Sequence, residues 1–377
     1  MSSCDIDAQA VTKIGHMKQE RTMGGRQLKA SVAVIAAGLA LAVTAAHGQS
    51  AAPTTGPITV PSFVLPYSTY NAPETVALFD RMRALPQLPP NASIPEMRAY
   101  YDVQNTDRVK RMRAMYDVKV TDITIGGVHV QRVLPSAGVA AANRGRVLVN
   151  LHGGAFMWGA NSGALAEAIP IAAVGRIEVL TVDYRLGPEN RFPAATEDVI
   201  AVYKALLGKY PARAIGIYGC SAGGGLTAQS VAWMIDKKIP VPGAIGTFCA
   251  SLVDLGGDSA YFAAAATGQV PSPATMPKLI SIPYFAGARA DDPMVFPGLS
   301  PAIVKRFPPT LLISGTRDFA LSSVLHSNEL LRAAGVKTEL RVWDGMPHAF
   351  FVDPEAAESK QAYQAIVDFF AANLVAK

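Results

Sequence analysis

Short apolar runs recur along this chain, and they alternate with longer segments, several of which have the 3.6-residue periodicity of a helix. A strand that is apolar at every position is typical of a parallel sheet covered on both faces by helices. Ahead of these runs, residues 120–134 alternate with a period of two around Gly126 and Gly127, which predicts a β-hairpin. We therefore expect an α/β fold with a mostly parallel central sheet and flanking helices. The apolar runs lie at 147–151, 178–182, 214–218, 244–248, 310–314 and 339–343.

The N-terminal residues 1–48 have the pattern of a secretory signal peptide. Arg26 and Lys29 precede an uncharged, Ala-rich stretch that ends in small residues. We expect cleavage after Gly48 and export to the periplasm or medium, with Met23 as an alternative start. A membrane span is the competing interpretation, but the stretch is short for a bilayer, so no stable span is expected after cleavage.

The rest of the chain divides into two expected regions. Residues 49–118 begin as a Pro-rich tether and continue as a helical N-terminal cap, and residues 119–377 form the main α/β domain. Within that domain, residues 255–285 lack a strand pattern and are expected to form a lid over the carboxyl ends of the strands, where ligands of parallel sheets bind. A peripheral excursion without substrate contact is the alternative.

Charge and composition exclude several functions. The 34 Lys and Arg residues exceed the 29 Asp and Glu residues by five, and they form no basic tract that would follow a phosphate backbone, so nucleic acid is not an expected partner. No Gly-rich nucleotide-binding motif and no metal-ligand spacing is present, so no cofactor and no metal are expected. Cys220 and Cys249, the cysteines that remain after signal removal, are expected to be free thiols.

The residues Gly-Cys-Ser-Ala-Gly at 219–223 fit the G-x-S-x-G pattern. The pattern is weak by itself, but here it follows an apolar run and precedes a helical stretch at 222–236, as a nucleophile elbow requires. Such a turn exposes the hydroxyl of Ser221 and directs the N–H of Ala222 at a developing oxyanion. A glycine-rich strand-to-helix loop without chemistry is the alternative.

A serine nucleophile needs a base, and four histidines remain after signal removal. His129 lies in the predicted hairpin, His152 precedes two glycines, and His326 lies in a predicted helix. His348 lies in a loop just after the run 339–343, where its ring can reach the elbow. We therefore expect His348 to be the base.

The third catalytic residue is expected between the serine and the histidine in sequence. Asp318 follows the run 310–314 and meets this condition. Asp344 is only four residues from His348 and is more suited to capping the loop, whereas Asp254 follows an earlier strand; both are weaker candidates.

A second set of oxyanion donors is expected at Gly153, Gly154 and Ala155. They follow the run 147–151 and offer consecutive N–H groups with almost no side chain, so a carbonyl oxygen can approach closely. A glycine turn that binds nothing is the alternative.

From about residue 118 to its end, the chain resembles the hormone-sensitive-lipase-like family of esterases. His-Gly-Gly-Ala-Phe at 152–156 is similar to the family's H-G-G-G-F/W, and Asp-Tyr-Arg-Leu-Gly-Pro-Glu at 183–189 is similar to its D-Y-R-L-A-P-E. Phe-Pro-Ala-Ala at 192–195, followed by Asp198, matches a further family stretch. Two departures are Cys220, where the family usually has Asp, and Ala155, where it has Gly; the first would hold the elbow less firmly and the second would narrow the approach.

The resemblance implies an α/β-hydrolase fold with a helical N-terminal cap and a catalytic triad of Ser221, Asp318 and His348. It also implies that Asp183 and Arg185 form pairs that stiffen the loop beside the oxyanion hole. The implied function is hydrolysis of short- to medium-chain acyl esters through an acyl-enzyme, with a small ester as the partner. A hydrolase of lactones, amides or peptides is the alternative, and a non-catalytic small-molecule binding protein is a weaker one. The implied oxyanion donors are the N–H groups of Gly153, Gly154, Ala155 and Ala222, of which the family would use about three.

Overall fold

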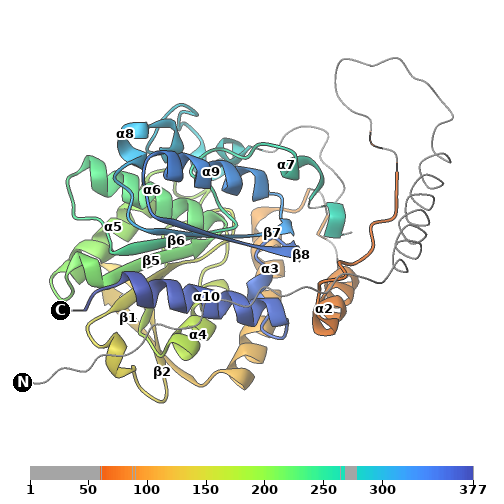
Figure 1. Ribbon diagram of the computed structural model, residues 1–377, viewed down its shortest axis with the longest axis horizontal. Coiled ribbons are helices and arrows are strands. Elements are labelled where there is room, and N and C mark those ends of the chain that lie inside the picture. The colour runs from red at the N-terminus through yellow and green to blue at the C-terminus, as the bar shows by residue number, and fades with distance from the viewer. Residues whose placement is uncertain are drawn as a thin grey trace, which may run out of the picture. The chain divides into compact units, whose positions relative to one another are not determined.

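The central sheet contains eight strands in the order β1-β2-β4-β3-β5-β6-β7-β8 (Figure 1). The computed structural model describes residues 60, 62–86, 88–89, 91–263, 265–267 and 278–376. The chain divides into residues 1–64 and 65–377, and every element described below belongs to the second unit. The strands are β1 Val118–Ile125, β2 Val128–Pro135, β3 Val147–Leu151, β4 Val179–Val182, β5 Ile215–Cys220, β6 Ala244–Phe248, β7 Thr310–Arg317 and β8 Thr338–Pro347.

Strand direction follows the expected pattern. The hairpin β1–β2 is antiparallel, β2 also pairs antiparallel with β4, and all the remaining neighbours are parallel. The central strands β3, β5 and β6 are buried at every residue, because helices cover both of their faces. The predicted α/β-hydrolase architecture is therefore confirmed, with β5 and β7 longer at their carboxyl ends than the apolar runs suggested.

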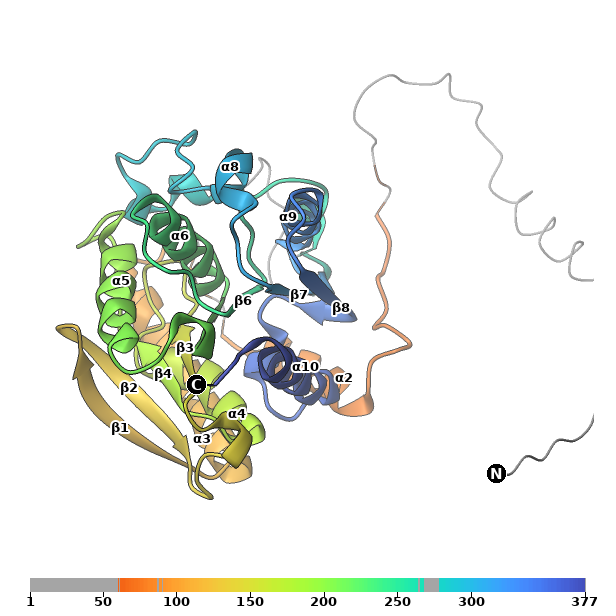
Figure 2. The same ribbon diagram turned by 60° about the vertical axis from the view of Figure 1, so that its left-hand side comes forward.

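Helices cover the sheet in two layers, which Figure 2 shows nearly edge-on. One layer holds α4 Ser162–Gly175 and α10 Ala357–Asn373, which share an apolar core with one face of the sheet. The other layer holds α5 Ala194–Leu207, α6 Ala222–Asp236 and α9 Leu321–Ala333, which share the second core. Shorter helices are α7 Ser259–Phe262, α8 Pro301–Val304 and the 3₁₀ turns Ala141–Asn143, Ala212–Ala214, Ala265–Thr267, Leu279–Ser281, Pro283–Phe285, Pro297–Leu299 and Phe350–Val352.

The segment before β1 is helical as expected, in the form of two helices, α2 Pro73–Ala84 and α3 Ile94–Met115. Ser93 begins α3 with a capping box, since its hydroxyl accepts the N–H of Glu96 and the Glu96 carboxylate accepts the N–H of Ser93. The ring of Tyr101 in α3 stacks on Trp158 with a centroid distance of 4.8 Å. This contact joins α3 to the loop that follows β3. None of the helices in the described ranges is both long and apolar enough to cross a bilayer.

Two predicted regions fall partly or wholly beyond the described residues. The signal peptide at 1–48 lies outside them, so it stays a prediction. The expected lid at 255–285 is described except for residue 264 and residues 268–277, and its described parts contain short helices and no strand.

Candidate active site

Ser221 lies in a sharp turn between β5 and α6. Its backbone has φ 55° and ψ −121°, a left-handed conformation that is strained for a residue with a side chain. The turn packs directly on the end of β3: a Cβ added to Gly223 would lie 1.7 Å from the main-chain oxygen of Leu151, and one added to Gly219 would lie 2.3 Å from the same atom. Glycine is therefore required at both positions, and the structure has the predicted elbow.

The N–H of Ala222 has no hydrogen-bond acceptor within its helix, because Ala222 lies at the helix start. Ala222 is the first residue of α6, and the first N–H groups of a helix have no acceptor in the preceding turn. These groups carry the positive end of the helix dipole. The elbow thus offers a hydroxyl and an oxyanion donor on adjacent residues.

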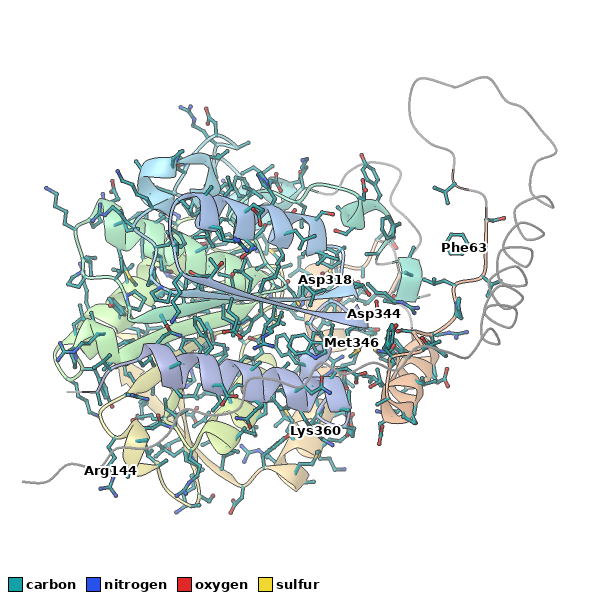
Figure 3. The ribbon with its side chains drawn as sticks, viewed as in Figure 1. Phe63, Arg144, Asp318, Asp344, Met346 and Lys360 are labelled. Carbon is teal, nitrogen blue, oxygen red and sulfur yellow. The ribbon has the colours of Figure 1, made fainter. Side chains whose placement is uncertain are left out.

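His348 and Asp318 are in direct contact. The Nδ1 atom of His348 lies 2.7 Å from Oδ1 of Asp318, although the two residues are 30 positions apart in the sequence. Asp318 follows β7 and His348 follows β8, and Figure 3 shows Asp318 at this end of the sheet. The His348 ring also stacks on Phe319, with a centroid distance of 4.2 Å. The imidazole is held by both a carboxylate and an aromatic face.

The Asp318 carboxylate is completely buried and has several donors. Oδ1 also accepts the N–H of Ala320 at 2.9 Å, and Oδ2 accepts the hydroxyl of Ser314 at 2.7 Å. Burial by itself raises the pKa of this carboxyl, but the charge and hydrogen bond of His348, with the two other donors, hold the pKa below its ordinary value. Asp318 is therefore ionised at neutral pH and able to stabilise an imidazolium.

The competing acids lie in other networks. Asp344, at the same end of the sheet in Figure 3, bonds with the hydroxyls of Ser68 and Thr316. Asp254 accepts the N–H groups of Leu255 and Leu279. The only acid of these three that contacts His348 among the described residues is Asp318, as expected.

The other histidines have structural surroundings. His129 contacts Asp183 at 3.1 Å and Asp122 at 3.2 Å on the partly exposed hairpin. His152 is fully buried, its ring stacks on Tyr184, and burial lowers its pKa to about 4, so it stays neutral. His326 lies on α9, as predicted.

Asp183 and Arg185 are both paired, though with separate partners. Arg185 binds Asp198 through Nε and through its backbone N–H, whereas Asp183 binds His129. Each residue therefore has a partner that can stiffen the loop, but Asp183 and Arg185 do not form an ion pair with each other.

Two cavities meet at Ser221 and His348. The first, of about 260 Å³, is lined mainly by apolar side chains and includes described residues at both ends of the expected lid. The second, of about 280 Å³, is walled by α3 and the loop after β3. The two arms of an ester bound at Ser221 would therefore meet different surroundings. Apolar residues of the first cavity include Phe156, Leu255, Ile282, Phe285, Val295 and Phe296, and the second includes Tyr101, Asn105, Arg108 and Trp158.

The loop after β3 differs from expectation at one residue. The N–H of Gly153 donates to Oε1 of Glu167 at 2.7 Å, so its single hydrogen is engaged and, among four expected donors of which about three would be used, Gly153 is the one that we set aside. Gly154 has φ 118° and Ala155 has φ 51°, and no acceptor for either N–H occurs in the described part of the chain. Gly154, Ala155 and Ala222 remain as candidate donors, with Ala155 lining both cavities.

Glu167 is the residue near the site that sequence reasoning missed. It lies in α4, is fully buried, and burial raises its pKa to about 8 despite hydrogen bonds from Gly153 and Asn150. No motif marks it. The available signal was a single acidic residue in the otherwise uncharged stretch 162–175.

The two predicted free thiols are confirmed. Cys220 and Cys249 are both buried and unbridged. Burial raises the pKa of Cys220 to about 11 and that of Cys249 well above its ordinary value, so both are protonated. Donor atoms of Cys249, Asp318 and His348 come within 4.8 Å of one another, a spacing open to a metal ion that sequence motifs did not indicate.

The sequence and the fold of this chain are both similar to those of known proteins. A family described as having the alpha/beta hydrolase fold matches residues 148–352. LipR of Mycobacterium tuberculosis, provisionally named an acetyl-hydrolase, is 31% identical over 247 residues, which cover 63% of this chain and 76% of LipR. The crystal structure of esterase E25 superimposes with a TM-score of 0.72 at 29% identity, covering 85% of this chain and 99% of E25. An esterase of the bacterial hormone-sensitive lipase family gives 0.69 at 25% identity, covering 81% and 100%.

Proposed function

Because this chain belongs to the α/β-hydrolase fold family, among the esterases related to hormone-sensitive lipase, we propose that it hydrolyses carboxylic esters with Ser221, His348 and Asp318 as its catalytic triad. The observation that carries the proposal is the 2.7 Å contact between His348 and the buried Asp318, at a cavity that both Ser221 and His348 line. A buried, ionised carboxylate on Nδ1 leaves Nε2 of the ring as the base for a hydroxyl.

The reaction proceeds in two acyl-transfer steps. Ser221 Oγ attacks the ester carbonyl while His348 takes the hydroxyl proton, and the oxyanion is stabilised by N–H groups of Gly154, Ala155 and Ala222. The intermediate then expels the alcohol, which receives the proton from His348. Water attacks the acyl-enzyme while His348 takes a proton from it, and His348 then returns that proton to Ser221 Oγ as the carboxylic acid leaves. Asp318 holds the ring and stabilises its cation throughout.

Short- to medium-chain acyl esters are the proposed substrates. The apolar cavity beside Ser221 has a volume of about 260 Å³ and is lined in part by Leu279, Ile282 and Phe285. An apolar cavity of this size accepts a short alkyl chain by burying it from water, but its volume limits the length. The related E25 is an esterase, which supports an ester as the substrate.

The test compares purified protein with matched variants on p-nitrophenyl acetate and butyrate. We expect Ser221→Ala to be inactive and Asp318→Asn to lose about 10⁴-fold in kcat. Asp344→Asn is the control, because Asp344 lies at the same sheet end but bonds to Ser68 and Thr316. Activity that survives Ser221→Ala would refute the proposal. A series of esters from acetyl to palmitoyl is expected to show a maximum among the shorter chains.

We also propose that residues 1–48 direct export of the chain. The basic residues Arg26 and Lys29 ahead of the uncharged stretch 30–46 support this proposal. Fractionation of producing cells and N-terminal sequencing test it. Mature protein beginning at Gln49 in the periplasm or medium is the expected result, and uncleaved protein confined to the cytoplasm would contradict it.

A further inference from the structure

The carboxyl group of Glu167 lies among three segments that form the proposed site. It comes from α4, in the layer on one face of the sheet, where it is buried and lines the second cavity at Ser221. Its Oε1 accepts the N–H of Gly153, which starts the loop after β3, and its Oε2 accepts Nδ2 of Asn150 at 3.1 Å. The backbone of Cys220, directly before the nucleophile, lies close enough to the carboxyl to lower its pKa. One side chain thus connects β3, its loop and the elbow.

The network behind Glu167 fixes its position. Asn150 lies inside β3 and is completely buried, and its Oδ1 accepts the hydroxyl of Thr181 from β4 at 2.8 Å. Oriented in this way, the Asn150 amide has its Nδ2 free to donate to Glu167. Because both strands belong to the rigid centre of the sheet, the carboxyl is held from behind by the part of the fold least able to move.

The loop in front of Glu167 has little conformational preference of its own. Gly153 and Gly154 are adjacent, and glycine loses more conformational freedom on folding than any other residue. A Cβ added to Gly153 would lie 3.3 Å from Glu167 Oε1 and 3.5 Å from Ser221 Cβ. The Gly153 peptide is therefore in the narrow space between the glutamate and the nucleophile, where an anchored N–H fixes the direction of the peptides that follow.

We propose that Glu167 is a positioning residue for ester hydrolysis: by holding the N–H of Gly153 it directs the N–H groups of Gly154 and Ala155 at the oxyanion. This inference rests on the proposed function of Ser221. Glu167 does not contact the reacting atoms in this account; it acts through the loop. Both oxygens of the carboxyl act as hydrogen-bond acceptors, Oε1 for Gly153 and Oε2 for Asn150, while burial raises its pKa to about 8.

Because the inference depends on the acceptor that Glu167 offers to Gly153, two substitutions are expected to differ. Glu167→Gln keeps an oxygen for Gly153 but places an amide NH2 opposite Nδ2 of Asn150, so its kcat is expected to fall less than about tenfold. Glu167→Met fills the same space without an acceptor, and its kcat is expected to fall about ten- to hundredfold, somewhat less than the loss of a whole oxyanion donor. KM is expected to change little in both, because the interaction matters only when the oxyanion forms.

The readout that separates positioning from stability is inhibition by a trifluoromethyl ketone, which forms an oxyanion on the serine. Its affinity is expected to weaken in Glu167→Met by the same factor as kcat/KM, and to weaken less in Glu167→Gln. Titration with a fluorophosphonate counts the folded active sites, so kcat refers only to these. If Glu167→Met does not fold, Glu167→Asp, which withdraws the carboxyl from Gly153 by one methylene, is expected to show the same losses.

Glu178 provides a matched control. It is also a buried acid, bound to Arg132 at 2.7 Å and Tyr210 at 3.2 Å, and it lines neither cavity at Ser221. Glu178→Gln and Glu178→Met are expected to change stability but not kcat or ketone affinity. The inference is overturned if Glu167→Met keeps the parent kcat and ketone affinity, or if Glu167→Gln loses as much as Glu167→Met. An inactive parent protein would refute the proposed function itself, and with it this inference.

Discussion

Burial of Glu167 makes the stability of this protein depend on pH in a defined direction. Its carboxyl has a pKa of about 8 in the folded chain against an ordinary value of 4.5, and burial is the largest cause. Below pH 4.5 the group is protonated in both states and imposes no cost. Between pH 4.5 and about 8 the carboxyl of Glu167 is ionised in the unfolded chain but still protonated in the folded chain. The free energy of unfolding therefore falls with rising pH until the folded group ionises near pH 8. A difference of about 3.5 in pKa corresponds to about 4 to 5 kcal/mol.

Glu167→Gln removes this dependence, since an amide does not ionise. The measured quantity is the difference in unfolding free energy between the variant and the parent, from urea titrations followed by the fluorescence of the three tryptophans at pH 5 to 9. We expect the variant to gain steadily on the parent up to about pH 8 and then to keep a constant difference. His152, whose pKa burial lowers to about 4, titrates in both proteins and cancels in the difference. If the unfolding free energies of the variant and the parent differed by the same amount at every pH from 5 to 9, the reasoning would be refuted.

Three further predictions concern the elbow, the thiols and the imidazole. Gly223→Ala is expected to cost at least about 3 kcal/mol in urea unfolding, because its Cβ would overlap a main-chain oxygen, whereas Gly225→Ala, with its nearest neighbour at 3.9 Å, is expected to gain up to about 1 kcal/mol; equal effects would contradict the packing of the elbow. Cys220, with a pKa of about 11, is expected to resist iodoacetamide at pH 8 until urea unfolds the chain, as peptide mass mapping would show, and rapid labelling of the folded protein would be inconsistent with its burial. Phe319→Ala removes the ring stacked on His348 and is expected to lower kcat about three- to tenfold with little change in KM; an unchanged kcat would mean that the carboxylate alone orients the imidazole.

Most of the fold could be predicted from local sequence patterns. The all-apolar strands β3 and β6 begin and end at the residues expected, because a strand buried on both faces is apolar at every position whatever its neighbours are. The elbow was predictable for a similar reason. A serine flanked by Gly219 and Gly223 between a strand and a helix needs those glycines to avoid the end of β3, so the cause of the turn is present in five consecutive residues.

The partners of side chains were less predictable, because they come from segments distant in sequence. Asp318 and His348 could be paired only by order along the chain, and their contact depends on β7 and β8 being neighbours in the sheet. The position of Gly153 in the sequence did not indicate its partner, because its N–H donates to Glu167 on α4 and not toward the predicted oxyanion position. No local pattern marks a partner that lies across a layer of the fold.

By itself, the sequence determined the α/β sheet, the elbow at Ser221 and the identities of the base and acid candidates, because each follows from periodicity, from glycine at a fixed spacing or from a short choice among few residues. Only the tertiary structure decided which N–H groups remain for an oxyanion, which acid faces His348, and that a carboxyl group with a raised pKa lies buried behind the loop. Those outcomes depend on which donor lies within hydrogen-bonding distance of which acceptor, and on how far burial outweighs hydrogen bonding for an ionisable group. Both are properties of three-dimensional packing and not of neighbouring residues in the chain.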